Sequence, residues 1–168
     1  MMKKIRISLL FVFLISLQNC SIRYSFTGAN TLAKTIYISN FQNRSTGGPP
    51  SLNIDFTEKL KEYYQRNSAL KIMDKKNEGE LAVTGSITGY TMSPIAATAD
   101  QAAQNRLTIT VEVDFVNTLE QKKNFKQNFS FYSDFPPNQS LSQVEGGKIT
   151  EILDQIILDI FNKTVADW

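Results

Sequence analysis

The stretch RLTITVEVDFVN, residues 106–117, alternates apolar and polar side chains along its length. Its apolar set is Leu107, Ile109, Val111, Val113 and Phe115, and its polar set is Arg106, Thr108, Thr110, Glu112 and Asp114. Successive side chains of a β-strand point to opposite faces of a sheet. The pattern therefore predicts a strand with one buried face and one polar face.

Two further stretches share this period. In residues 81–89, Leu81, Val83 and Ile87 alternate with mostly Thr and Ser. In residues 125–131, three phenylalanines alternate with Lys126, Asn128 and Ser130. A loop at residues 94–104 and a charged turn at residues 119–124 join the three stretches, which predicts an antiparallel meander. The polar side of this predicted sheet carries Thr84, Ser86, Thr88, Thr108, Thr110, Asn128 and Ser130.

Two other stretches have the period of a helix. An apolar stripe between Leu52 and Tyr63 follows Ser51, which is placed to cap the helix. A longer stripe follows a capping-box pattern at residues 142–145 and runs to Phe161. The pair Gly146-Gly147 in the first turns is expected to weaken the start of this second helix.

These elements predict an α+β fold. Shorter strands are expected at residues 34–41 and 70–73. Two singly striped helices and a sheet with one apolar face give a two-layer sandwich. We expect a four- to five-stranded, mostly antiparallel sheet with both helices packed on one face, as a single domain over residues 34–168.

The other face of the predicted sheet is left uncovered by this arrangement. One interpretation is a plain solvated surface. The other is a wet contact surface, on which short hydroxyl side chains hydrogen-bond a partner or a sugar-bearing ligand. The sequence leaves both interpretations open.

Cys20 is the only cysteine of the chain and follows a signal-peptide pattern. Three basic residues precede an apolar run at residues 7–17 and a short polar step. The pattern predicts a lipoprotein signal peptide at residues 1–19, lipidation of Cys20 and a lipid-anchored tether at residues 20–33. The alternative is an ordinary cleaved signal with a chance free cysteine, which the lack of an Ala-x-Ala step disfavours. Ser21 after the cysteine is compatible with the outer membrane, on its periplasmic side.

The composition disfavours an enzyme. The chain has no histidine, which removes the commonest general base and metal ligand. No phosphate-binding loop and no zinc or calcium spacing is present in the sequence. We therefore expect no cofactor and no metal site, although a hydrolase built from two distant carboxylates is left open.

Net charge bears on the partners. Three of the 18 basic residues lie in the predicted signal, so residues 20–168 carry 15 basic and 16 acidic side chains, a formal charge of −1. A near-neutral chain disfavours nucleic acid as a partner. Lys122, Lys123 and Lys126 form a local basic cluster, and Arg106 begins the most regular strand. These four side chains are candidate contacts for phosphate groups, with a solvated turn as the alternative for the lysines.

A family resemblance rests on a series of stretches in a fixed order. After Cys20 these are YSFTGA (24–29), DFTEKL (55–60), GSITGY (85–90), AAQNRLTITV (102–111), FKQNFSFYSDF (125–135) and DIFNK (159–163). The series resembles the LptE family of lipopolysaccharide-assembly lipoproteins, in a divergent branch, over nearly all of the mature chain. No single stretch is diagnostic, and the series as a whole carries the resemblance.

The resemblance implies a small sheet with two helices on one face. It also implies a function: LptE-like proteins sit as a plug inside the outer-membrane barrel LptD, help that barrel assemble, and bind lipopolysaccharide. Arg106 and the three lysines would then contact lipid A phosphates or acidic barrel loops. The polar sheet face would meet the polar barrel interior. The alternative function is a periplasmic lipoprotein that scaffolds or activates a cell-wall synthesis enzyme.

Overall fold

The computed structural model of the chain describes residues 31–98 and 102–165, so Cys20 and the predicted signal lie outside the described residues. The elements are β1 (Thr35–Ile38), β2 (Gln42–Asn43), α2 (Leu52–Asn67), β3 (Lys71–Met73), β4 (Leu81–Ile95), β5 (Gln104–Asn117), β6 (Phe125–Phe135) and α3 (Leu141–Thr164). Two short 3-10 turns, η2 (Lys76–Glu78) and η3 (Gln121–Lys123), precede β4 and β6.

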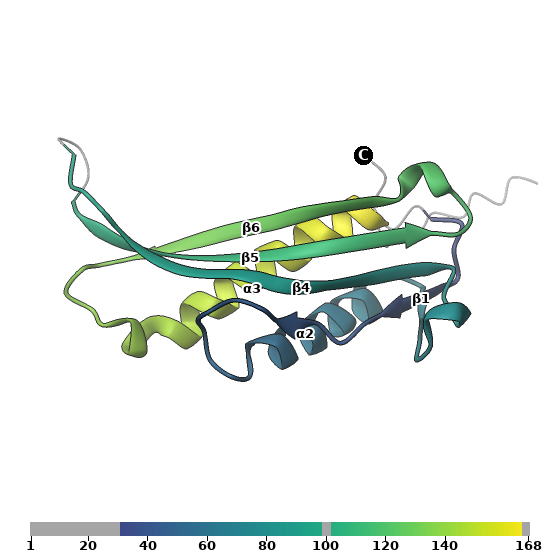
Figure 1. Cartoon of the computed structure of the whole chain (residues 1–168), viewed down its shortest axis with the longest axis horizontal. Helices are drawn as coiled ribbons and strands as arrows, with labels where there is room; N and C mark the ends of the chain where they lie inside the picture. The colour runs from purple at the N-terminus through teal and green to yellow at the C-terminus, as the bar shows by residue number, and fades with distance from the viewer. Residues whose placement is uncertain (1–30, 99–101, 166–168) are drawn as a thin grey trace, which may run out of the picture.

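The strands form one sheet with both helices on the same face (Figure 1). The order is β3-β1-β4-β5-β6, and β2 pairs with β4 beyond the end of β1. The predicted meander β4-β5-β6 is antiparallel, with Val111 opposite Ile87 on one side and Phe129 on the other. The predicted α+β class and the shared face of the two helices are therefore confirmed.

The strand count and direction differ in detail from the prediction. The sheet has six strands, and β1 runs parallel to both β3 and β4. The chain crosses over through α2 between β1 and β3, and a crossover of this length brings the second strand back parallel to the first. The predicted strand at 34–41 is also divided, because Phe41 turns into the core, where only 1% of it is exposed.

The core lies between the helices and the apolar face of the meander. Leu107, Ile109 and Val111 of β5 are fully buried, as the alternation predicts. Tyr64 on α2 is also fully buried, and its hydroxyl hydrogen-bonds the hydroxyl of Thr164 on α3. Burial raises the pKa of Tyr64 well above its ordinary value, so this hydroxyl stays protonated and links the two helices inside the core.

β4 is longer than predicted because a β-bulge changes its pleat. The register shifts between Ile87 and Gly89, after which Tyr90 pairs with Ile109 and points to the helix face. Its hydroxyl donates to Glu145 on α3 at 2.5 Å. Burial and this neighbouring carboxylate raise the pKa of Tyr90. The bulge thus joins the outer half of β4 to the start of α3.

The predicted loop at residues 94–104 is wrong at both ends, since β4 runs to Ile95 and β5 begins at Gln104. Pro94 lies within β4, but β2 pairs only with Ser86 and Ile87. The outer half of β4 is therefore a sheet edge, where a strand tolerates proline.

Both helix starts differ from the prediction at the level of side chains. The capping box of α3 is formed by Ser140 and Gln143, not by residues 142–145. The carbonyl oxygen of the Gln143 side chain accepts the Ser140 backbone N–H at 2.9 Å, while Glu145 is engaged by Tyr90. Ser51 occupies the cap position of α2, but its hydroxyl donates to the Asp55 carboxylate at 2.9 Å rather than capping the backbone.

The glycine pair does not interrupt α3, which is continuous from Leu141 to Thr164. Apart from its chain neighbours and the backbone of its own helix, no described atom lies within 4 Å of a Cβ added at Gly146. A Cβ at Gly85 in β4 would lie 2.1 Å from the Glu112 carbonyl oxygen. Helix interiors favour Ala over Gly by about 0.5–1 kcal/mol. The two glycines therefore differ in their roles: Gly85 permits close strand packing, and Gly146 costs helix stability without a packing reason.

We expect Gly146→Ala to raise the free energy of unfolding by about 0.5–1 kcal/mol and the melting temperature by about 2–5 °C. Gly85→Ala is the matched control and should lower stability by about 1–3 kcal/mol, because β4 and β5 must separate to admit the methyl group. Thermal unfolding followed by circular dichroism measures both changes. A lower melting temperature for Gly146→Ala would mean that the first turns of α3 are not helical.

Candidate functional site

The sheet face opposite the helices carries most of the predicted site residues. The antiparallel register aligns its side chains in rows across β4, β5 and β6. The rows are Thr84-Asp114-Lys126, Ser86-Glu112-Asn128, Gly89-Thr110-Ser130, Thr91-Thr108-Tyr132 and Ser93-Arg106-Asp134. We call this surface the open face.

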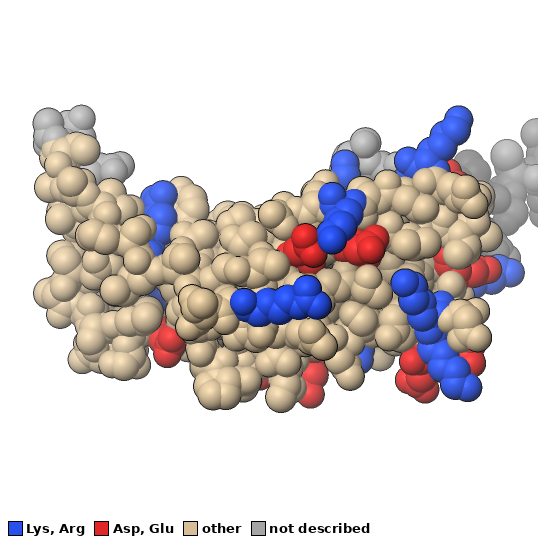
Figure 2. Space-filling model, viewed as in Figure 1, with Lys and Arg blue, Asp and Glu red and all other residues tan. Residues whose placement is uncertain are grey.

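Charged side chains are unevenly distributed over the face of the molecule that Figure 2 draws. In the space-filling view, most of them gather at the end away from the β4–β5 hairpin tip, and the hairpin end is largely uncharged (Figure 2). The middle rows of the open face are built from uncharged residues, with Thr110 and Ser130 sharing a hydroxyl–hydroxyl hydrogen bond of 2.9 Å. Such side chains can donate and accept by rotation, so they adapt to a water-rich contact.

The predicted polar residues share this face but not the same exposure. Thr88 is exposed at the β-bulge, and Asn128 and Ser130 are exposed on β6. Thr84, Thr108 and Thr110 are half-buried. Ser86 is buried, with only 3% exposed, because it lies between Gln42 on β2 and Glu112 on β5. Ser86 is therefore part of the support of the open face rather than its contact surface.

Arg106 lies at the hairpin end of the open face in a compact cluster. Its Nε and one terminal nitrogen donate to the two carboxylate oxygens of Asp134 at 2.7 and 2.8 Å. Its guanidinium carbon is 3.5 Å from the centre of the Tyr132 ring, a cation–π contact. The hydrogen bond from Arg106 holds the pKa of Asp134 below its ordinary value. The cluster presents a flat, largely neutralised guanidinium–aromatic surface.

The predicted lysines lie at the opposite end. Lys126 on β6 pairs with Glu112 at 3.2 Å, and Lys123 on η3 pairs with Glu120 at 3.2 Å. Lys122, also on η3, is exposed. On β5, Arg106 pairs with Asp134 and Asp114 pairs with Lys126. Arg106 and Asp114 are eight residues apart, so Arg106 and Lys126 are separated by roughly 27 Å along the strands. The structure therefore does not bring Arg106 and the lysines into one site.

Tyr132 and Asp134 were missed by reasoning from the sequence. Both lie in the stretch 125–135, and the register that pairs Phe115 with Phe125 also pairs Arg106 with Asp134. Counting residues outward from the charged turn would have placed this carboxylate opposite Arg106. The signal was thus present, but it depended on knowing which residues pair at the turn.

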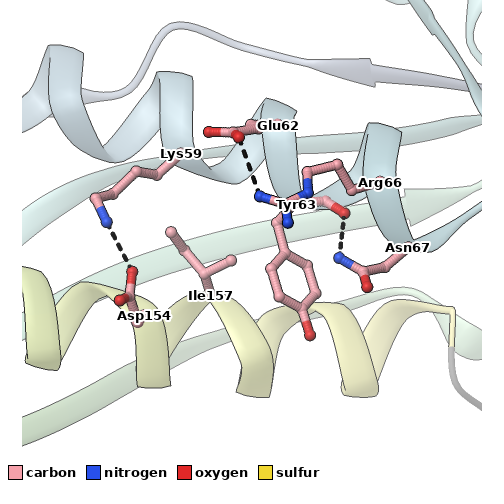
Figure 3. Close-up of a pocket in the computed structure, with 7 residues that line it drawn as sticks. All are labelled: Lys59, Glu62, Tyr63, Arg66, Asn67, Asp154 and Ile157. Atoms are coloured by element: carbon pink, nitrogen blue, oxygen red, sulfur yellow. Dashed lines mark hydrogen bonds and ion pairs between the residues drawn. The ribbon is translucent and has the colours of Figure 1, made fainter.

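A second concave region lies between the two helices (Figure 3). This pocket of about 460 Å³ is bordered by a Lys59–Asp154 ion pair of 2.8 Å that joins α2 to α3. An Arg66–Glu62 pair of 3.2 Å lies along α2. The four charged side chains drawn in Figure 3 are paired with one another. We therefore assign the Lys59–Asp154 pair to linking the two helices, and the Arg66–Glu62 pair to α2 itself.

Two kinds of site are absent from residues 31–98 and 102–165. No group of three or more Cys, Asp or Glu side chains there is arranged to hold a metal ion. Within the same residues, no helix combines the length and apolar character needed to cross a membrane.

A comparison with protein-family models matches residues 33–164 to the family LptE, described as lipopolysaccharide-assembly. The chain belongs to the LptE family. The match includes every strand of the sheet and both helices among the described residues. The resemblance inferred from the ordered stretches is confirmed. A comparison with curated protein sequences gave no match.

Solved structures share the fold of this LptE-family chain at low sequence identity. An uncharacterized lipoprotein B from Nitrosomonas europaea has 9% identity and a TM-score of 0.53, covering 83% of this chain and 87% of its own. A minor lipoprotein from Acinetobacter baumannii has 13% identity and a TM-score of 0.50, covering 77% and 91%. The PelC dodecamer from Paraburkholderia phytofirmans has 6% identity and a TM-score of 0.50, covering 82% and 93%. At these identities the likeness concerns the fold alone.

The Arg106–Asp134 pair should make stability depend on pH. The folded-state pKa of Asp134 is lowered, so its contribution is complete above the unfolded pKa near 3.8 and is lost as the pH falls through the lower folded value. We expect Asp134→Asn to melt below the wild type at pH 6 and to approach it below about pH 3. Melting temperatures over this range measure the difference. A constant gap between the two proteins at every pH would contradict the assignment.

Proposed function

We propose that this LptE-family protein is an outer-membrane lipoprotein that acts as the plug and assembly partner of an LptD-type β-barrel. In this role it takes part in lipopolysaccharide transport and insertion into the outer leaflet, without catalysing a reaction itself. The observation that carries the proposal is the open face. Both helices cover the opposite side of the sheet, so the rows of hydroxyl and amide side chains are left for a partner.

A polar barrel interior is a suitable partner for this face. The lumen of an outer-membrane barrel is lined with polar side chains and water. The middle rows of the open face offer Thr108, Thr110 and Ser130, which form hydrogen bonds without carrying charge. Burying such a face costs little electrostatic energy, because the desolvation penalty of isolated charges is avoided. Ion pairs lie at its two ends, where Arg106 is bonded to Asp134 and Lys126 to Glu112.

The basic side chains divide into two candidate contacts for lipopolysaccharide phosphates. Lys122 and Lys126 are exposed at one end, with 61% of the Lys126 side chain accessible. Arg106, Lys123 and Lys126 are each bonded to a carboxylate, so a phosphate there would have to share or replace Asp134, Glu120 or Glu112. Lysine binds phosphate as a point charge and arginine as a fork, so the two ends would bind it differently.

The anchor sets how far the domain extends from the membrane. If Cys20 is lipidated, residues 20–33 form the tether before β1 begins at Thr35. A fully extended chain of this length spans at most about 50 Å. The domain would then stay within that distance of the periplasmic leaflet, close enough to enter a barrel in the same membrane.

We expect Cys20→Ala to give an unlipidated species that is uncleaved or soluble, because the thiol that would carry the acyl chains is lost. Fractionation and gel mobility measure this change, and Ser21→Ala is the matched control that should remain anchored. Unchanged attachment and mobility of Cys20→Ala would contradict lipidation at this residue.

The partner is tested by capture and by site-specific crosslinking. A tagged full-length protein should retain a large β-barrel in stoichiometric amount when extracted gently from its own membranes. A photoreactive amino acid at Thr91 or Thr110 on the open face should crosslink to that barrel more strongly than one at Glu58, which is exposed on α2.

Two outcomes would contradict the plug proposal. Capture of a cell-wall synthase in place of a barrel would favour the scaffolding alternative. A barrel that crosslinks at Glu58 but not at Thr91 or Thr110 would retain the partner and reject the open face as its contact.

A further inference from the structure

The edges of the sheet are not equally protected against pairing with another strand. At one end β3 has only three residues, and the outer half of β4 carries the bulge at Ile87 and Gly89 and contains Pro94. Short strands, bulges and prolines are the usual devices that stop edge-to-edge pairing. The remaining edge is β6, which has 11 residues and ends the strand order.

β6 lacks these devices. It pairs with β5 through an unbroken register from Phe125 to Phe135, and it contains no proline. Its two charged residues are Lys126 and Asp134, so the seven residues between them are uncharged. Its outer edge therefore offers a straight row of backbone N–H and C=O groups that can bind another strand.

The sequence of β6 is complementary to itself in the antiparallel direction. Suppose that Ser130 lies opposite Ser130 of a second copy. A residue that precedes Ser130 by a given number of positions then faces the residue of the other copy that follows Ser130 by the same number. The resulting pairs are Phe125 with Phe135, Lys126 with Asp134, Gln127 with Ser133, Asn128 with Tyr132, and Phe129 with Phe131. Each apolar residue meets an apolar one, and the positive charge meets the negative one.

We propose that the protein forms a homodimer through antiparallel β6–β6 pairing centred on Ser130. A two-fold axis perpendicular to the sheet relates the copies, so the contact is isologous and closed. The two six-stranded sheets become one continuous sheet, with all helices on one side and both open faces on the other. This self-association goes beyond the proposed function and does not require the barrel.

The charges already present on the open face support this register. Within one copy, Glu112 bonds Lys126, and Arg106 bonds Asp134. Placing Lys126 beside the Asp134 of a second copy extends these pairs into a chain of alternating sign: Glu112, Lys126, Asp134 and Arg106. Opposite charges directly across an antiparallel pair are favourable, and like charges there are unfavourable. A register shifted by two residues would lose this match at both ends.

The register is tested by disulfide crosslinking in the full chain. Residues directly opposite each other have Cβ atoms about 4.5–5.5 Å apart, near the distance that a disulfide spans. Mild oxidation of Ser130→Cys in membranes should therefore give a species of twice the mass on a non-reducing gel, reversed by reductant. The unsubstituted protein, which retains Cys20, controls for crosslinking through that cysteine.

Asn128→Cys is the matched control on the same strand. In the proposed register two such cysteines are offset by four residues, roughly 13 Å along the strand, and should not crosslink. Asn128→Cys mixed with Tyr132→Cys should crosslink, since these positions face each other. No crosslink from Ser130→Cys, or an equal one from Asn128→Cys alone, would overturn the proposal.

A second variant tests the association without a disulfide. Ser130→Lys places two like charges opposite each other at the axis, and should convert a dimer to a monomer in sedimentation of the detergent-solubilised full chain. Thr84→Lys adds the same charge on β4, away from the edge, and should leave the dimer intact. A wild-type protein that stays monomeric at micromolar concentration would overturn the proposal. Capture of the barrel by the unsubstituted protein tests the plug role separately.

Discussion

The two-residue period of β5 is the constraint on which the rest of this structure depends. Every second side chain from Leu107 to Phe115 is apolar and buried, and water must be excluded from that face by another layer. Helices α2 and α3 supply this layer, and each presents a single apolar stripe to the sheet. Because the same strands place their polar residues on the other side, sealing one face leaves the open face free. The core and the candidate site are thus two results of one pattern.

This pattern explains why the fold persists when the residues change. The solved structures that resemble the chain share only 6–13% of their residues with it, yet they align over most of its length. A pleated strand requires apolar character at alternate positions rather than particular side chains. Membership of the LptE family is consequently visible in the series of stretches and in the architecture, and not in one diagnostic motif.

The sequence predicted those elements whose structure follows from one local period. It did not predict features that depend on how segments distant in the sequence pair with one another. The alternation of residues 106–117 and the helical stripes identified the meander, both helices and the covered face. The parallel β1 could not be read from its own residues, because its direction follows from the crossover through α2. Tyr90 changed faces through a one-residue bulge that leaves no clear mark in the sequence. Capping-box patterns begin at both Ser140 and Ser142, and the structure forms the box of Ser140 with Gln143. Glu145, which would complete the other box, accepts a hydrogen bond from Tyr90 instead.

The topology of the sheet also bears on the order in which it forms. Only short connections separate β4 from β5 and β5 from β6, whereas the β1–β4 register joins residues 45 positions apart, such as Ile36 and Leu81. Closing a longer loop costs more conformational entropy and slows the pairing that depends on it. We therefore expect the meander to form first and β1 to dock afterwards onto the edge of β4. The open face belongs entirely to the meander, so this surface is expected to be complete before β1 is in place.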